Sequence, residues 1–150
     1  MHGGEPFDFP GPHTQSIAVT EAHIDGLGHV NNAVYVQWCE RVAWDHSAQL
    51  GLSLADYRAL DRAMAIRQAQ YDYVLPALQG DSLILATWLT ASDARLNMTR
   101  QFQLLRGRET LMRGCWQLVC IEMSSGRARR MPEAFLSTYQ PAVVEAGDEQ

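Results

Sequence analysis

The spacing of apolar residues along the chain changes from a strand period to a helical period near residue 31. Before that point, Ile17 and Val19 share one face of a short strand predicted at residues 14–20. A helix of about five turns follows from Asn31 or Asn32. Gly51 stands where a helix C-terminal residue is expected. The apolar positions with helical spacing are Tyr35, Trp38, Cys39, Val42, His46 and Leu50.

After this helix the chain reads as strands. Ser53-Leu-Ala-Asp56 has the form of a capping box and predicts a short helix to about Leu60. Alternation then predicts four strands, at residues 64–74, 83–91, 96–105 and 111–123. In the strand at 96–105, one face holds Leu96, Met98, Phe102 and Leu104, and the other holds Asn97, Thr99, Gln101 and Gln103. Long strands with short turns favour an antiparallel meander.

This element order excludes a doubly wound α/β sheet, because no crossover helices separate the later strands. The compact alternative is an α+β fold in which a curved antiparallel sheet of about five to six strands wraps around the one long helix. Trp38 and Cys39 would be buried inside it.

Length and composition indicate a single soluble domain at residues 14–139. Residues 1–13, rich in Gly and Pro, are expected to form a flexible arm, and residues 140–150 a polar tail. No apolar run approaches the roughly 20 residues that a membrane span needs, and no signal peptide is evident. The protein is therefore expected to be cytoplasmic, with its three cysteines reduced.

The net charge of −5 argues against a general nucleic-acid binder. The arginines are unevenly placed, since six of the twelve lie between residues 106 and 130. They form either a solvated strand surface beside an acidic tail or a patch for a phosphorylated ligand. In the second case the candidates are Arg127, Arg129 and Arg130.

The stretch from His23 to Tyr35 brings together a carboxylate, imidazoles and the free N–H groups of a helix start. Asp25 is either a turn residue beside two glycines or a catalytic carboxylate. His23, Asp25 and His29 also have the composition of a metal site, but their spacing spans a glycine turn and no further ligand is evident, so metal binding is not favoured. Asn31 and Asn32 are both good N-cap residues.

Asp25-Gly-Leu-Gly28-His29-Val-Asn31-Asn32-Ala-Val-Tyr35, followed by Glu40, resembles the signature of hotdog-fold thioesterases of the 4-hydroxybenzoyl-CoA thioesterase family, most closely the acyl-CoA thioesterase branch. Tyr73-Val-Leu-Pro76 with Gly80-Asp81 resembles the strand and turn after the helix in that family. The resemblance spans residues 14–136. Plant acyl-carrier-protein thioesterases share the His-Val-Asn-Asn core, whereas aromatic-substrate members differ there.

The resemblance implies that Asp25 is catalytic, as base or nucleophile, and that a backbone N–H near Asn32 stabilises the oxyanion. It also implies sites formed between two subunits, an apolar acyl channel, CoA phosphates on surface arginines, and no metal or cofactor. His29 would orient the thioester or bond to Asp25, or would only satisfy nearby backbone groups. Asn31 or Asn32 would hold the loop. Tyr35 and Glu40 are further substrate-binding candidates, and for Glu40 a structural ion pair is favoured over support of catalysis.

Two functions are compatible with these residues. The first is an acyl-CoA thioesterase that hydrolyses a fatty or other apolar acyl thioester, and the alternative is a hotdog domain that binds acyl-CoA or acyl-carrier protein without turnover. Because a single curved sheet leaves its edge strands unpaired, a homodimer or homotetramer is expected.

Overall fold

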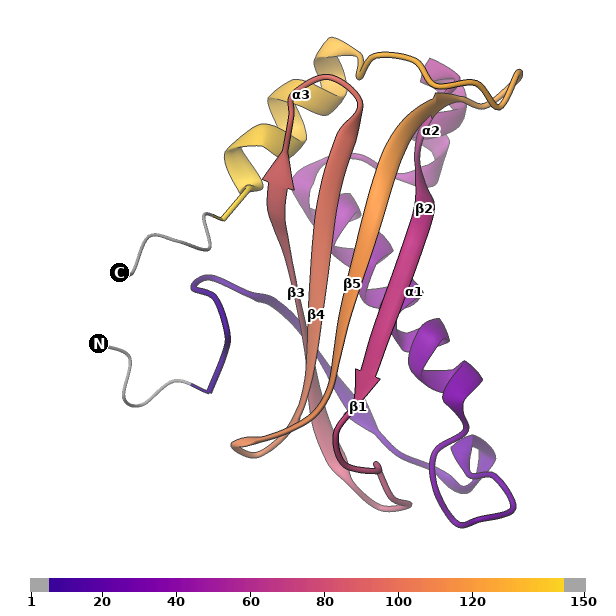
Figure 1. The fold of residues 1–150 in the computed structure, drawn as a ribbon, viewed down its shortest axis with the longest axis vertical. Helices are drawn as coiled ribbons and strands as arrows, with labels where there is room; N and C mark the ends of the chain where they lie inside the picture. The colour runs from indigo at the N-terminus through magenta and orange to yellow at the C-terminus, as the bar shows by residue number, and fades with distance from the viewer. Residues whose placement is uncertain (1–5, 145–150) are drawn as a thin grey trace.

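A computed structural model describes residues 6–144, which form one curved antiparallel sheet of five strands with a long helix across its inner face (Figure 1). The predicted α+β architecture is confirmed. The elements in chain order are β1 (His13–Ala18), the short 3-10 turn η1 (Glu21–His23), α1 (Asn32–Leu50), α2 (Leu54–Leu60), β2 (Arg62–Tyr73), β3 (Ser82–Ser92), β4 (Asn97–Arg106), β5 (Glu109–Glu122), α3 (Glu133–Tyr139) and η2 (Gln140–Ala142).

The strand order in the sheet is β1-β3-β4-β5-β2, and every neighbouring pair is antiparallel. The predicted meander holds for β3, β4 and β5. It is wrong for β2, which pairs with β5 and forms one edge of the sheet. The two helices between β1 and β2 carry the chain to that far edge, so residues 74–81 must cross back before β3 begins.

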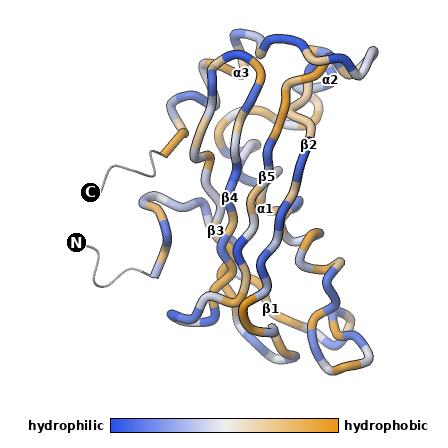
Figure 2. Tube along the Cα trace, in the orientation of Figure 1, coloured by the Kyte–Doolittle hydropathy of each residue, from blue (hydrophilic) through white to orange (hydrophobic). Residues whose placement is uncertain are grey.

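The inward face of α1 is the one that helical spacing predicts. Trp38 is 2% exposed and Cys39 is fully buried against the sheet. Gly51 ends the helix with φ 121°, a conformation that favours glycine. Ser53 and Asp56 form the predicted capping box at the start of α2. Figure 2 shows apolar and polar residues alternating along the strands, which separates the inner from the outer face.

The outer face of the sheet is partly covered by the segment before β1. Gln103, predicted on the polar face of its strand, is fully buried, and its side-chain amide donates to the carbonyl of Pro6 while its Oε1 accepts from the N–H of Asp8. Trp88 donates its indole N–H to the carbonyl of Pro10 at 3.0 Å. Residues 6–12 form no helix or strand, but these contacts hold them on the sheet, and His13 already belongs to β1.

The end of the described chain packs in a way that was not predicted. α3 buries Phe135 and Tyr139, and the N–H of Val144 donates to the carbonyl of Leu89 at 2.8 Å. Residues 140–144 of the predicted tail therefore lie on the sheet, and the rest of that tail is outside the described residues. All three cysteines are free thiols, as expected. Between residues 6 and 144, no helix is long and apolar enough to cross a membrane.

Candidate active site

The loop before α1 is closed by its own backbone. The N–H of Asp25 donates to the carbonyl of His29 at 2.8 Å, and the N–H of Gly28 donates to the carbonyl of Asp25 at 3.1 Å. Gly28 has φ 81°, which a side chain would strain. Ile24 and Val30 form a β-bridge at the base of the loop. The loop is therefore a small, defined hairpin.

The Asp25 carboxylate serves this hairpin with one of its two oxygens. Oδ1 accepts the backbone N–H groups of Leu27 at 2.9 Å and His29 at 3.2 Å. Oδ2 has no hydrogen-bond partner among residues 6–144. The turn role and a chemical role are thus compatible, because the oxygen that holds the loop is not the one left open.

The first turn of α1 separates the roles of its two asparagines. Asn31 is the N-cap, and its Oδ1 accepts the N–H of Ala33 at 2.9 Å. Its carbonyl accepts the N–H of Val34 at 2.9 Å. The N–H of Asn32 has no acceptor within the described chain, as expected for a first helical residue. The helix dipole makes this N–H a favourable site for negative charge.

Asp25, His29 and Asn32 line one open cleft with Tyr35 and Tyr73. Tyr35 is buried, and its hydroxyl accepts the N–H of Ala77 at 3.1 Å. Burial raises the pKa of Tyr73, so its phenol stays neutral near pH 7. The wall that sequence reasoning did not assign to the site is the segment after β2, which includes Val74, Leu75 and Pro76. Its sequence signals were the proline break at its end and the resemblance of Tyr73-Val-Leu-Pro76 to the thioesterase family, and neither placed it beside Asp25.

The two histidines of the loop differ in their surroundings. His29 is exposed, and among the described residues only its backbone, not its imidazole, bonds to Asp25. The Nδ1 of His23 accepts the N–H of Thr20 at 3.0 Å, and its ring packs edge-on against Trp38. Within residues 6–144 no three His, Cys, Asp or Glu side chains are grouped as metal ligands would be.

Glu40 does not form the expected ion pair. Its side chain is exposed, and none of the ion pairs within the described chain includes it. The reason is that position 40 sits at the margin of the face of α1 that packs on the sheet. It borders a second cavity, described below.

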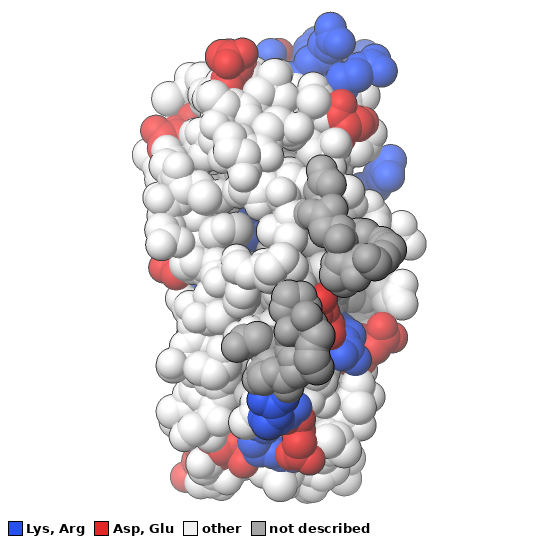
Figure 3. All heavy atoms as spheres, turned by 90° about the vertical axis from the view of Figure 1, so that its left-hand side faces the viewer, with Lys and Arg blue, Asp and Glu red and all other residues white. Residues whose placement is uncertain are grey.

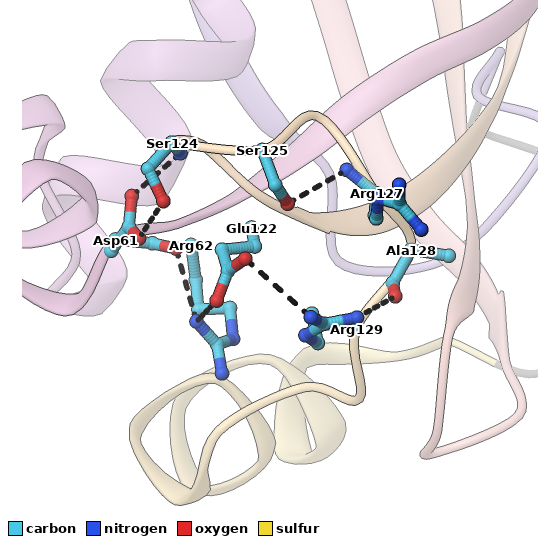
Figure 4. Close-up of polar contacts among 8 residues, drawn as sticks. All are labelled: Asp61, Arg62, Glu122, Ser124, Ser125, Arg127, Ala128 and Arg129. Carbon is cyan, nitrogen blue, oxygen red and sulfur yellow. Dashed lines mark hydrogen bonds and ion pairs between the residues drawn. The ribbon is translucent and has the colours of Figure 1, made fainter.

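The three candidate arginines lie in the segment after β5, at the opposite end of the molecule from the loop before α1, which contains Asp25 (Figure 1). Figure 3 shows basic side chains gathered at that end. Figure 4 shows Arg129 next to Glu122, at 3.6 Å, while the side chain of Arg127 makes no drawn contact. Arg130 is exposed as well. Within one chain, therefore, these arginines and Asp25 are not brought together.

Comparisons with known proteins identify the family and the fold of the chain. The family model of the thioesterase-like superfamily matches residues 19–138. A chloroplastic acyl-acyl carrier protein thioesterase from Arabidopsis thaliana is 23% identical over 82 residues, which are 55% of this chain and 43% of that protein. The chain thus spans less than half the length of this curated relative.

Solved structures share the fold. A 1,4-dihydroxy-2-naphthoyl-CoA thioesterase from Synechocystis superposes with a TM-score of 0.77 at 22% identity, over 87% of this chain and 96% of that one. A Staphylococcus aureus protein in complex with CoA gives a TM-score of 0.80 at 18% identity, over 89% and 86%. These likenesses confirm the predicted hotdog fold.

Proposed function

Because the chain belongs to the thioesterase-like superfamily, we propose that it hydrolyses acyl thioesters at the cleft beside the start of α1. The observation that carries the proposal is that Asp25 and Asn32 line the same cleft. Among the described residues, Oδ2 of Asp25 has no hydrogen-bond partner and the backbone N–H of Asn32 has no acceptor. Thioester cleavage needs both groups.

In the proposed reaction, the carbonyl carbon of the thioester lies between these two groups. Asp25 either activates a water molecule or attacks the carbonyl directly to give a mixed anhydride that water then hydrolyses. The N–H of Asn32 donates to the developing oxyanion, aided by the dipole of α1. The thiolate leaves and the free acid is released. His29, at the rim, positions the thioester.

We further propose that the acyl group has an apolar body and that the thiol is CoA. Tyr35, Tyr73, Val74 and Leu75 give the cleft an apolar wall. The CoA-bound structural neighbour supports CoA, and the plant relative supports acyl-carrier protein as the competing carrier. The free thiols of all three cysteines fit the proposed cytoplasmic location.

The proposed assembly is a homodimer, or a tetramer of dimers, built on β2. This strand is an edge in the single chain, and Ile66 and Tyr73 on it are 45% and 46% exposed. If two β2 strands pair antiparallel about a two-fold axis, the long axes of the two protomers point in opposite directions. The segment with Arg127, Arg129 and Arg130 of one protomer would then approach the Asp25 end of the other. This supports a role for these arginines with CoA phosphates.

Thiol release from straight-chain, branched and aromatic acyl-CoAs, with calorimetric binding of the same ligands, tests the function. We expect turnover of straight-chain acyl-CoAs. Tight binding without thiol release would favour the non-catalytic alternative. Light scattering tests the assembly. We expect a dimer for the wild type and a weaker dimer for Ala69→Glu, which places like charges near the proposed axis, and a monomeric wild type would contradict it.

A further inference from the structure

A second cavity, of about 160 Å³, lies between the C-terminal half of α1 and the inner face of the sheet. Its size is close to the roughly 150 Å³ that holds a benzene ring in a protein core. α1 contributes Glu40, Ala43, Trp44 and Ser47, which helical spacing places on one face. The sheet contributes apolar walls, formed by Met64, Ile66, Met98, Trp116 and Leu118.

One cation lines this apolar cavity. Arg100 comes from β4, between the buried Met98 and Phe102, and is only 4% exposed. Its Nη1 donates to Nδ1 of His46 at 2.9 Å and to Oγ1 of Thr87 at 3.1 Å. Since an arginine only donates, Nδ1 of His46 must accept, which makes the imidazole neutral with its proton on Nε2. Both partners of Arg100 are therefore uncharged.

Arg100 has no counter-charge within the described chain. None of the ion pairs among residues 6–144 includes Arg100. Glu40, which also lines the cavity, forms no ion pair with it. Burial lowers the pKa of Arg100 to about 10, so the guanidinium is still protonated at neutral pH. A buried charge without an opposite charge is costly, and an incoming anion would offset that cost.

Two nitrogens of the guanidinium have no partner among the described residues. Nε and Nη2 make no hydrogen bond to any described residue, and neither belongs to the polar atoms that are sealed away without a partner. Arg100 lines the cavity, so a ligand held there is the partner that these two nitrogens could bind. The Nε and Nη2 edge is a fork that matches the two oxygens of a carboxylate.

The three hydroxyl groups of the cavity, on Ser47, Tyr57 and Tyr139, already donate their protons to neighbouring protein groups. Ser47 donates to the carbonyl of Leu52 at 2.8 Å, so at 2.6 Å from Tyr139 it must accept. Tyr139 in turn accepts from Tyr57, because each hydroxyl has one proton. Burial raises the pKa of both tyrosines and keeps them neutral. Among the described residues that line the cavity, Arg100 is the only charged group left with donors for a ligand, and the indole N–H of the half-exposed Trp44 is the one neutral donor without an acceptor.

We infer that this cavity binds a carboxylate at the far end of the acyl group, so that the protein selects acyl thioesters that carry a second carboxyl group. The inference rests on the proposed thioesterase function. Ala43 at the cavity lies eleven residues after Asn32, or roughly 16 Å along the helix axis. The acyl body would have to span that distance along α1, from the thioester in the cleft to the guanidinium in the cavity.

The test compares two acyl-CoAs of equal carbon number, one ending in a carboxylate and one in a methyl group, over several lengths. The wild type should prefer the carboxylate-ended thioester in kcat/KM at one length. Arg100→Met should lower that preference about tenfold or more, mainly through KM. Arg100→Lys keeps the charge and should retain part of it. Arg113→Met is the matched control, because this strand arginine pairs with Asp8 on the outer face.

Calorimetry with the free acids separates this inference from the proposed function. If no acyl-CoA is hydrolysed, the thioesterase proposal fails, and tighter binding of the dicarboxylic acid to wild type than to Arg100→Met still supports the cavity. The inference would be overturned if the wild type showed equal kcat/KM or equal affinity for the carboxylate-ended and methyl-ended ligands, or if Arg100→Met kept the wild-type preference. Arg100 would then have a structural role only. If Arg100→Met does not fold by circular dichroism, the ligand preference of the wild type decides.

Discussion

Asp25 and His29 are joined by two hydrogen bonds, and both use the backbone of His29: the Asp25 N–H donates to the His29 carbonyl, and Asp25 Oδ1 accepts the His29 N–H. The Gly28 N–H closes the turn on the Asp25 carbonyl. The imidazole of His29 takes no part within the described chain. Any residue at position 29 that keeps the backbone should therefore preserve the loop.

His29→Ala should accordingly leave the free energy of unfolding within about 0.5 kcal/mol of wild type. It should lower kcat/KM by less than 100-fold, since a positioning group contributes less than a proton-transfer group. Urea unfolding and thiol-release kinetics measure the two quantities. A loss as large as that of Asp25→Asn would instead give the imidazole a direct part in proton transfer.

The oxyanion donor is testable because it belongs to the backbone. Asn32 is the first helical residue, where proline is tolerated, and Asn31 already has φ −62° and ψ 138°, which a following proline favours. Asn32→Pro should fold normally and lower kcat by about 100- to 1,000-fold. Asn32→Ala, which keeps the N–H, is the control and should remain active. Near-wild-type turnover by Asn32→Pro would place the oxyanion elsewhere.

Stability should fall in mild acid because of His46. Burial, followed by the charges of Arg100 and His13, lowers the pKa of His46 to about 3 from 6.5. As the pH falls below about 6.5, the unfolded chain binds a proton that the folded protein does not. This contribution to the free energy of unfolding is complete above pH 6.5 and is lost toward pH 3, by up to about 1.4 kcal/mol per pH unit.

Urea unfolding between pH 7 and about pH 4 measures that slope. His46→Gln retains an acceptor for Arg100 and should flatten the pH dependence of the free energy of unfolding. His29→Gln, at an exposed position, should leave that pH dependence as in wild type. Identical slopes in wild type and His46→Gln would contradict the assignment of a neutral His46.

Replacing Arg127, Arg129 and Arg130 together by Gln should raise KM for acyl-CoA about tenfold or more, because charge-assisted contacts to phosphate are lost. KM for the matching pantetheine thioester, which lacks the nucleotide phosphates, should change little. Equal effects on both thioesters would remove the CoA role. Stability should be nearly unchanged, since these side chains are exposed and only Arg129 forms an ion pair within the described residues.

The sequence predicted the parts of the fold in which local pattern and tertiary burial agree. Residues Tyr35 to Val42 repeat with helical spacing because one side of α1 faces the sheet. The position of β2 was not predictable in this way, because alternation shows which face is buried and not which strand is the neighbour. The buried Gln103 was missed because its cover, residues 6–10, has no periodic pattern.

Two misses did have a signal. Phe135 and Tyr139 are four residues apart after Pro132, a spacing typical of one helix face, and α3 begins there. Arg100 stands between Met98 and Phe102 on the apolar face of β4, where a charge needs an explanation. At the candidate active site, the hairpin follows from the glycines, and the free N–H of Asn32 follows from the helix start. The wall formed by Val74 to Pro76 could not be predicted, because it depends on the path of residues 74–81 from the far edge of the sheet back to β3.

The most direct measurement is turnover by Asp25→Asn. Asparagine keeps an oxygen at Oδ1 for the N–H groups of Leu27 and His29, so the loop should persist while the base or nucleophile is lost. Asp93→Asn is the matched control, because Asp93 also accepts backbone N–H groups in a turn but lies between β3 and β4, away from the cleft. We expect Asp25→Asn to bind acyl-CoA and to lose at least about 100-fold in kcat, with Asp93→Asn near wild type. Cleavage by Asp25→Asn at the wild-type rate would contradict the assignment of Asp25 and, with it, the proposed reaction.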